Sequence, residues 1–179
     1  MPLGEISLRP ASPADNEFLV HAYASTRQDE MESWGWNSAQ QASFVEMQFA
    51  ARRRGYAAEY PSAEICIICV GESRAGSIII SRRQSEIRLV DITLLPEFRS
   101  RGIGGHLIGT LIHDAARSRS ALRLNVLHGN RARRLYERLG FVGEGGDSMY
   151  CEMEWKAADQ DQSVAGVPLE SDPNAGPSE

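Results

Sequence analysis

A short segment rich in arginine and glycine, Arg99–Gly104 (RSRGIG), separates a strand-like run from an amphipathic helix. Residues 86–94 before it read as a strand, and apolar side chains three or four apart over residues 103–116 predict a helix with one buried face. The first amides of such a helix have no internal partner, and the helix dipole adds positive charge there. Because the two glycines admit a ligand to the backbone and the two arginines add charge, the segment predicts a phosphate site.

Two common phosphate-binding motifs do not fit this segment. A dinucleotide-binding turn needs a third glycine, where this chain has Leu107, and an acid about twenty residues farther on, where it has Leu122 or Arg123. A Walker loop needs a lysine after its last glycine, and the only lysine of the chain is Lys156. Both motifs are therefore excluded by residue identity.

The segment does match the pattern R-x-x-G-x-G, and it resembles the coenzyme A pyrophosphate loop of the Gcn5-related N-acetyltransferase (GNAT) superfamily. Farther along, residues 130–141 (NRARRLYERLGF) resemble the fourth helix of that family and its LYxxLGF ending. The close match spans residues 86–142. The resemblance implies an α/β (α+β) fold, in which a mixed, mostly antiparallel sheet is flanked by helices.

Hydrophobic periodicity predicts the same layout without the resemblance. It predicts strands at 6–9, 64–70, 75–82, 86–94, 122–127, 141–144 and 149–155, and helices at 13–25, 38–54, 103–118 and 131–139. Gly55 is expected to end the second helix. The short turns between residues 64 and 94 predict an antiparallel meander, whereas the strand–helix–strand passage from 89 to 127 predicts a parallel pair with a right-handed crossover.

Charge divides the chain into a neutral body and an acidic tail. The tail after Lys156 holds five acids and no base, which leaves 19 acids and 19 bases in residues 1–156. We therefore expect one domain over 1–156 and a disordered acidic tail over 157–179. The neutral body argues against nucleic-acid binding. The sequence shows no apolar run long enough to cross a membrane and no signal-peptide pattern. We therefore expect a cytoplasmic protein that does not bind a membrane.

The cysteines and histidines indicate no metal or redox site. Cys66 and Cys69 lie three apart in a predicted strand, so they should face opposite sides of the sheet and act as small apolar residues. None of the four histidines has the spacing of a metal ligand. No metal is therefore expected.

The resemblance also implies a site for acetyl-coenzyme A as acyl donor. A bulge near residues 93–95 of the fourth strand would free the Leu94 amide to stabilise the oxyanion of the reacting thioester. Asn130 matches a residue that contacts the pantetheine arm, and an asparagine there also suits a helix N-cap. The implied donor-binding residues are Leu94, Leu95, Arg99, Ser100, Arg101, Gly102, Ile103, Gly104, Gly105, Asn130 and Tyr136.

Tyr136 matches the family tyrosine that protonates the leaving thiolate. The general base is less defined. Asp91 lies on the strand of Leu94, where alternation places it on the same side as Leu89 and Thr93, and it could act as the base, orient the acceptor or make structural hydrogen bonds. Glu30 and Glu32 are weaker candidates for the base.

These features predict an N-acetyltransferase that moves an acetyl group from acetyl-coenzyme A to a primary amine by direct attack in a ternary complex. The acceptor is a small molecule or a peptide, and a homodimer is compatible with the resemblance. One alternative is a regulatory module that binds acyl-coenzyme A without catalysis. Another is a protein or peptide N-acetyltransferase.

Overall fold

A single sheet of seven strands, in the order β1-β2-β3-β4-β5-β7-β6, organises the chain. The computed structural model describes residues 4–157, so the predicted disorder of the tail lies outside the described residues except at 157. The strands are β1 (Ile6–Pro10), β2 (Glu64–Val70), β3 (Ser73–Arg82), β4 (Glu86–Leu94), β5 (Ala121–Leu127), β6 (Val142–Gly146) and β7 (Tyr150–Trp155). All neighbouring strands are antiparallel except the parallel pair β4 and β5, which confirms the predicted fold class.

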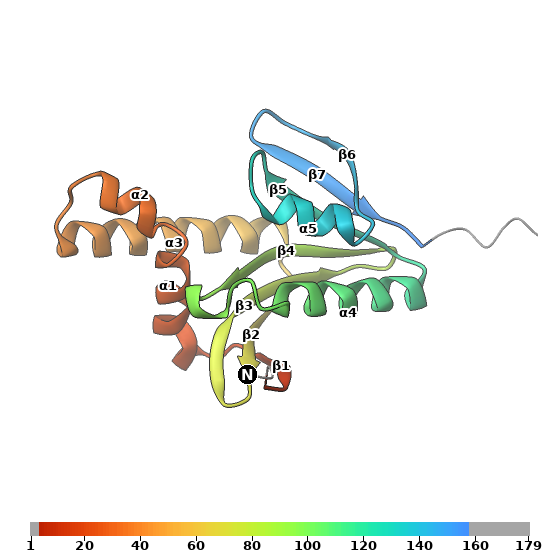
Figure 1. Cartoon of the computed structure of the whole chain (residues 1–179), viewed down its shortest axis with the longest axis horizontal. Coiled ribbons are helices and arrows are strands. Elements are labelled where there is room, and N and C mark those ends of the chain that lie inside the picture. The colour runs from red at the N-terminus through yellow and green to blue at the C-terminus, as the bar shows by residue number, and fades with distance from the viewer. Residues whose placement is uncertain (1–3, 158–179) are drawn as a thin grey trace, which may run out of the picture.

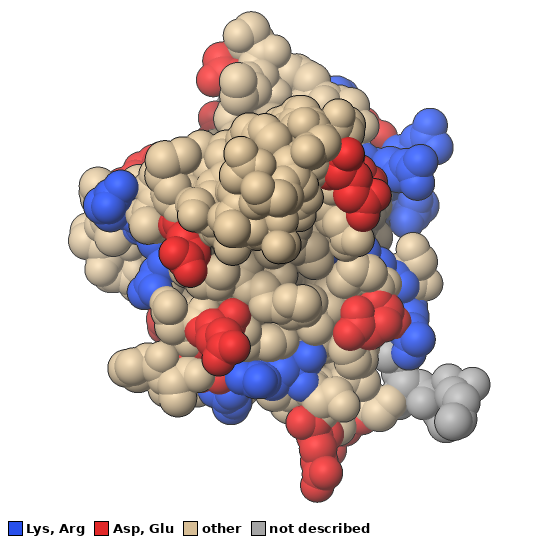
Figure 2. Space-filling model, turned by 90° about the vertical axis from the view of Figure 1, so that its left-hand side faces the viewer, with Lys and Arg blue, Asp and Glu red and all other residues tan. Residues whose placement is uncertain are grey.

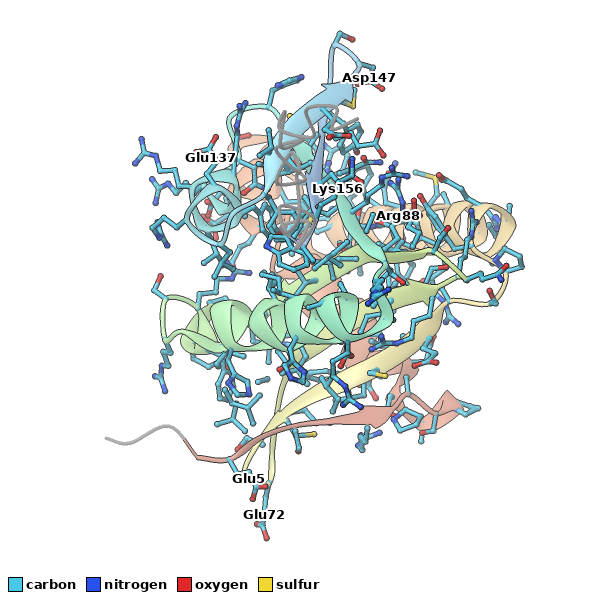
Figure 3. The ribbon with its side chains drawn as sticks, turned by 90° about the vertical axis from the view of Figure 1, so that its right-hand side faces the viewer. Glu5, Glu72, Arg88, Glu137, Asp147 and Lys156 are labelled. Atoms are coloured by element: carbon cyan, nitrogen blue, oxygen red, sulfur yellow. The ribbon has the colours of Figure 1, made fainter. Side chains whose placement is uncertain are left out.

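Helices cover both faces of this sheet (Figure 1). They are η1 (Pro13–Asp15), α1 (Asn16–Ala24), α2 (Gln28–Ser33), α3 (Ser38–Glu59), η2 (Pro96–Phe98), α4 (Ile103–Ser118) and α5 (Ala132–Arg138). Figure 3 shows Glu5 and Glu72 at one end of the molecule and Asp147 at the other, with Arg88 of β4 between them. No helix within residues 4–157 combines the length and the apolar character that crossing a bilayer requires.

Two helical predictions are corrected. The sequence pattern does not predict the short helix α2, and α3 continues through Gly55 to Glu59. A glycine inside a helix costs only about 1 kcal/mol relative to alanine. The effective stop is Pro61, because a proline disfavours the helical conformation of the residue before it. Tyr60 accordingly leaves the helix with φ −128° and ψ 67°.

The sheet has a separate apolar core on each face. On one face α4 and α5 pack against β2 to β5 and β7, and on the other α1 packs against β2 with help from α3. Cys66 belongs to the α4 core and Cys69 to the α1 core. The expectation that these two thiols face opposite sides is therefore confirmed.

A bulge at Val90 interrupts the regular alternation of β4. Ile80 of β3 pairs with Leu89, and Ile79 pairs with Asp91, so Val90 has no partner on β3. The predicted position of the bulge, near residues 93–95, is wrong, because the ladder there stays regular as far as the pair of Gly76 with Leu94. Since the side-chain period of a strand is two, the extra residue reverses the two faces of β4 beyond it.

The reversal is visible in the packing of β4. Ile87 and Leu89 before the bulge and Ile92 and Leu94 after it all pack on the α4 core. Asp91 therefore lies on the α3 side, opposite to Leu89, which corrects the predicted grouping of these two residues.

Strands β4 and β5 are paired only over their first halves. The parallel register joins Glu86–Leu89 to Ala121–Leu124 and ends there, although both strands continue. An ion pair reinforces this joint, because the Glu86 carboxylate of β4 lies 2.8 Å from the Arg123 guanidinium of β5. Glu86 also pairs with Arg88 of its own strand, at 3.2 Å. The sheet consequently opens between the second halves of β4 and β5.

Gly76 provides a test of the β3–β4 register. A Cβ on Gly76 would overlap the carbonyl oxygen of Thr93, so Gly76→Ala should lower the free energy of unfolding by about 1–3 kcal/mol, the usual cost of overpacking. Gly109→Ala is the control, because a Cβ there meets nothing within 4 Å in a helix and should stabilise by up to about 1 kcal/mol. Urea denaturation measures both effects. The register would be contradicted if the urea midpoints of Gly76→Ala and Gly109→Ala shifted from the wild-type midpoint in the same direction by the same amount.

Candidate functional site

A cleft of about 610 Å³ lies where β4 and β5 separate. Its walls are Leu89–Ile92 of β4, Leu124–Leu127 of β5 and the side of α3 between Gln48 and Glu59. All five tyrosines of the chain line it: Tyr23, Tyr56, Tyr60, Tyr136 and Tyr150. The cleft therefore lies between the two halves of the sheet, with phenol groups contributed by α1, α3, α5 and β7 and by the residue that follows α3.

The turn before α4 presents a row of unused backbone donors. Ser100 and Gly102 adopt left-handed conformations, with φ of 58° and 82°. Within residues 4–157, the amides of residues 100–105 have no hydrogen-bond acceptor, and the first amide that does is that of His106, which donates to Gly102. A row of outward amides at a helix start is an arrangement that binds anions. The segment predicted from its arginines and glycines thus has the geometry that phosphate binding requires.

The side chains of the two loop arginines have different surroundings. The Arg101 guanidinium lies 5.8 Å from the centre of the Phe98 ring and makes no ion pair within the described residues. The Arg99 guanidinium instead donates to the Leu94 carbonyl and to Ser25 at the end of α1. The sequence predicts that the charge of Arg99 serves the anion, whereas the structure uses its donors within the protein.

The β3–β4 register determines which amides of β4 face the cleft. Leu95 donates to the Ala75 carbonyl, so Leu94 and Gly76 form a non-hydrogen-bonded pair. The Leu94 amide consequently points away from β3, towards the gap left by β5, and has no acceptor in the described part of the chain. Leu95, also predicted to bind the donor, has its amide engaged and its side chain buried with α1.

Asp91 projects from β4 towards α3 and forms an ion pair there. Its carboxylate lies 2.5 Å from the Arg52 guanidinium and accepts a longer hydrogen bond, 3.4 Å, from the Thr93 hydroxyl. The Asp91 side chain is 18% exposed and lines the cleft. Burial raises the pKa of this carboxyl, and the charge of Arg52 offsets part of the rise.

Arg52 is a site residue that the sequence did not reveal. The Arg52 guanidinium lies over the rings of Tyr23 and Tyr56, at 5.5 and 5.3 Å from their centres, and donates to the Tyr56 hydroxyl at 2.8 Å. Burial and the charge of Asp91 raise the pKa of Tyr56 to about 12 although Arg52 opposes the rise. The only sequence signal for Arg52 was its spacing of four from Tyr56 on one helix, which does not identify a partner on β4.

Tyr136 and Asn130 lie in the opposite wall. Tyr136 is 6% exposed, packs against Phe141 with ring centres 5.8 Å apart, and lines the cleft. Burial and then the charge of Asp91 raise the pKa of Tyr136 to about 12. The Asn130 side chain accepts a hydrogen bond at 2.9 Å from the amide of Ala132, the first residue of α5, and it also lines the cleft.

The other candidates for the general base, Glu30 and Glu32, lie away from the cleft. Glu30 forms an ion pair with Arg27 at 2.7 Å, and neither Glu30 nor Glu32 lines the cleft. Trp34 and Trp36 pack against each other at a tilt and edge-to-face against Phe44, at the end of the molecule formed by α2 and the start of α3. Figure 2 views the molecule from this end, and the centre of the surface is largely free of charged side chains.

The cleft continues into a second hollow of about 420 Å³, which shares the side chains of Tyr60, Arg88 and Tyr150 with it. Among residues 4–157, no group of three or more histidine, cysteine or acidic side chains is arranged to hold a metal ion. The polar side chains that line the cleft are phenols, arginines, carboxamides and the carboxylates of Asp91 and Glu59.

Solved structures of acetyltransferases share this fold. The PaiA N-acetyltransferase of Thermoplasma acidophilum, solved with coenzyme A, matches with a TM-score of 0.63 and 18% identity over 86% of this chain and 99% of that one. An acetyltransferase of Thermus thermophilus matches with a TM-score of 0.61 and 15% identity over 88% and 100%. A GNAT acetyltransferase of Elizabethkingia anophelis with acetyl-CoA bound matches with a TM-score of 0.53 and 14% identity over 85% and 98%.

No curated protein sequence matches the chain significantly. The sequence model of the acetyltransferase (GNAT) family matches residues 23–141, which is well over half of the chain. This match agrees with the layout of the sheet, with the opening between β4 and β5 and with the free amides before α4. The chain belongs to the GNAT acetyltransferase family.

Proposed function

We propose that this protein transfers an acetyl group from acetyl-coenzyme A to a primary amine. The observation that carries the proposal is the combination of a row of unpartnered amides at residues 100–105 with a cleft that holds a partly buried carboxylate and a buried phenol. Family membership supports acyl-coenzyme A as the donor, as do the neighbours solved with coenzyme A or acetyl-CoA. The acceptor and the steps below are our inference from the residues of this chain.

The donor is held at its diphosphate by the loop before α4. The amides of residues 100–105 supply the hydrogen bonds, the α4 dipole adds partial positive charge, and Arg101 supplies a full charge that no other group within 4–157 neutralises. The diphosphate can approach the backbone of Gly104 and Gly105 closely, because these residues have no side chain. A Cβ placed on Gly104 or Gly105 would meet only Leu135, at 3.7 or 3.8 Å. The pantetheine arm then runs into the gap between β4 and β5, past Asn130.

Transfer begins when the neutral amine nitrogen attacks the thioester carbonyl carbon and the carbonyl oxygen becomes an oxyanion. The Leu94 amide, which points into the gap, donates to that oxygen. Asp91 takes the proton that the amine loses. Its raised pKa makes it a stronger base than an ordinary aspartate, while Arg52 holds the carboxylate in place.

The tetrahedral intermediate collapses as the carbon–sulfur bond breaks. Tyr136 gives its phenolic proton to the departing sulfur, and the proton held by Asp91 returns to solvent through the cleft. With a pKa of about 12 the phenol stays protonated at neutral pH, so it is always ready to donate. Full transfer to a thiolate, whose conjugate acid has a pKa of about 8.5, is uphill, so the hydroxyl donates its proton while the bond breaks, and the phenolate then takes up a proton from solvent.

The acceptor enters from the α3 side of the cleft. Gly55 and Ala51 lie on this wall, and a Cβ on Gly55 would meet nothing within 4 Å, which leaves space beside Tyr56. The hollow that continues past Tyr60 and Tyr150 gives room for an acceptor longer than its reacting amine. This continuity also accommodates the amino terminus of a peptide, the second candidate acceptor.

A thiol-release assay tests this function. With acetyl-coenzyme A as donor, a panel of polyamines, aminoglycosides, amino acids and peptides should contain at least one amine that releases coenzyme A thiol and gains an acetyl group by mass spectrometry. Calorimetric binding of coenzyme A without transfer to any amine would instead favour a regulatory module. Absence of coenzyme A binding would contradict both functions.

Gly102→Val tests the anion site. Gly102 has φ of 82°, and a valine there introduces strain of about 1–3 kcal/mol and displaces the amides from their outward row. We expect the calorimetric Kd for coenzyme A to rise at least about tenfold, equivalent to 1.4 kcal/mol. Gly71→Val is the matched control, because Gly71 also has a positive φ, 59°, and a Cβ there would also meet nothing within 4 Å. Gly71 lies in the β2–β3 turn, so this variant should leave the Kd for coenzyme A unchanged. Equal affinities in the two variants would remove the loop from donor binding.

Tyr136→Phe tests the acid. The variant keeps the ring that packs on Phe141 and loses the hydroxyl, so it should bind coenzyme A normally and lower kcat by about 10- to 1000-fold. Steady-state kinetics on an accepted amine measures the effect on kcat, and calorimetry measures coenzyme A binding. Tyr150→Phe is the control, because this half-exposed tyrosine also lines the cleft but belongs to the acceptor side. Wild-type turnover in Tyr136→Phe would refute the assignment.

The pH dependence tests Asp91. Because the Asp91 pKa is raised, its basic form is lost as pH falls through that value, so kcat should decline on the acid side at a pH above the ordinary aspartate pKa of about 3.9. In Asp91→Asn this limb should disappear and kcat should fall by about 100-fold or more. Measuring kcat at saturating amine separates this effect from protonation of the free acceptor. An unchanged acid limb in Asp91→Asn would show that another group is the base.

A further inference from the structure

Arg99 makes three side-chain hydrogen bonds that leave it little freedom to follow a ligand. Its Nε donates to the Leu94 carbonyl at 2.9 Å, and its Nη2 donates to the Ser25 carbonyl and hydroxyl at 3.2 and 3.1 Å. The two acceptor residues are far apart in sequence, one at the end of β4 and the other 74 residues before Arg99. One guanidinium therefore joins the loop before α4, the end of β4 and the end of α1.

At Ser25 the guanidinium meets the carboxyl end of α1. Ser25 is the residue that follows the helix, and its hydroxyl also donates to the Ala22 carbonyl at 2.7 Å. The last carbonyls of a helix lack internal donors and carry partial negative charge, so a guanidinium is a favourable partner for them. Arg99 thus acts as a cap for α1 supplied from another part of the chain.

The segment around Ser25 also contributes side chains to the wall of the cleft that faces the acceptor, here called the acceptor wall. Tyr23 and Arg27, two residues to either side of Ser25, both line the cleft, and the Tyr23 ring lies under the guanidinium of Arg52. Arg27 is followed directly by α2. A shift of Ser25 would therefore move the side chains that face the acceptor.

We propose that Arg99 is a positioning residue that ties the donor loop to the acceptor wall and does not bind the donor phosphates through its side chain. The proposal rests on the function proposed above. It assigns to Arg99 the coupling between the donor site and the acceptor site of the protein. Its neighbour Arg101, whose guanidinium makes no ion pair within residues 4–157, serves the phosphates instead. The two arginines, two positions apart, should then affect different substrates.

Arg99→Met and Arg101→Met separate these roles. For Arg99→Met we expect the acceptor KM to rise about tenfold, as for the loss of charge-assisted hydrogen bonds, with a change of less than about threefold in the calorimetric Kd for coenzyme A. For Arg101→Met we expect the reverse. Arg117→Met, on the exposed end of α4, should change neither. If Arg99→Met weakens coenzyme A binding as much as Arg101→Met and leaves the acceptor KM unchanged, the proposal is wrong.

Hydrogen–deuterium exchange of the free protein provides a readout without catalysis. Arg99→Met should speed exchange at the end of α1 and in α2, residues 22–33, whereas Arg101→Met should not. Arg99→Lys should restore part of the protection, because an ammonium group donates to carbonyls but lacks the guanidinium fork. Ser25→Ala, which removes only the hydroxyl acceptor, should give a smaller increase in the same segment.

The two readouts distinguish failure of the coupling from failure of the proposed function. Faster exchange at residues 22–33 in Arg99→Met supports the link to α1 even if no amine is acetylated, in which case only the proposed function fails. Unchanged exchange in both Arg99→Met and Ser25→Ala overturns the link, whatever the wild-type activity.

Discussion

The extra residue at Val90 is the constraint on which the rest of the site depends. Without it, strict alternation would put Asp91 on the same face as Leu89, inside the apolar core under α4, where an unpaired carboxylate is costly. With it, Asp91 meets Arg52 on the other face. The pairing of β4 with β5 ends one residue before the bulge, at Leu89. One local irregularity thus opens the sheet and directs an ionisable side chain into the opening.

Beyond the bulge, one face of β4 carries apolar side chains and the other carries polar ones. Ile92 and Leu94 direct their side chains into the α4 core, while Asp91 and Thr93 direct theirs towards α3. The Leu94 amide lies in the plane of the sheet and points to neither face. The apolar packing, the carboxylate and the backbone donor therefore come from consecutive residues without competing for space. The free energy gained by burying the apolar side chains fixes the position of the polar groups.

Much of the architecture was predictable, because strands and helices with a buried face carry their period in the sequence. The limits of β2, β4 and α4 agree with the prediction to the residue, and the amides of residues 100–105 are free as expected, whereas the Arg99 amide donates to the Pro96 carbonyl. Three features were not predictable. The bulge depends on the β3 register, the partner of Asp91 lies 39 residues away on another helix, and the bonds of Arg99 depend on where α1 ends. Each requires a tertiary contact that no local pattern specifies.

The short β4–β5 ladder has a mechanical consequence. Four residue pairs form the backbone connection between strands β1 to β4 and strands β5 to β7, and the ion pair of Glu86 with Arg123 adds a side-chain link between β4 and β5. This narrow connection is the hinge between the two halves, and because α4 packs against strands on both sides of it, the ladder and the α4 core together resist any widening of the gap. Arg123, which is 37% exposed, belongs to this hinge and lies within reach of dissolved ions. Because salt screens exposed ion pairs, added salt weakens the pair of Arg123 with Glu86 and makes the hinge less stiff, far from the reacting atoms.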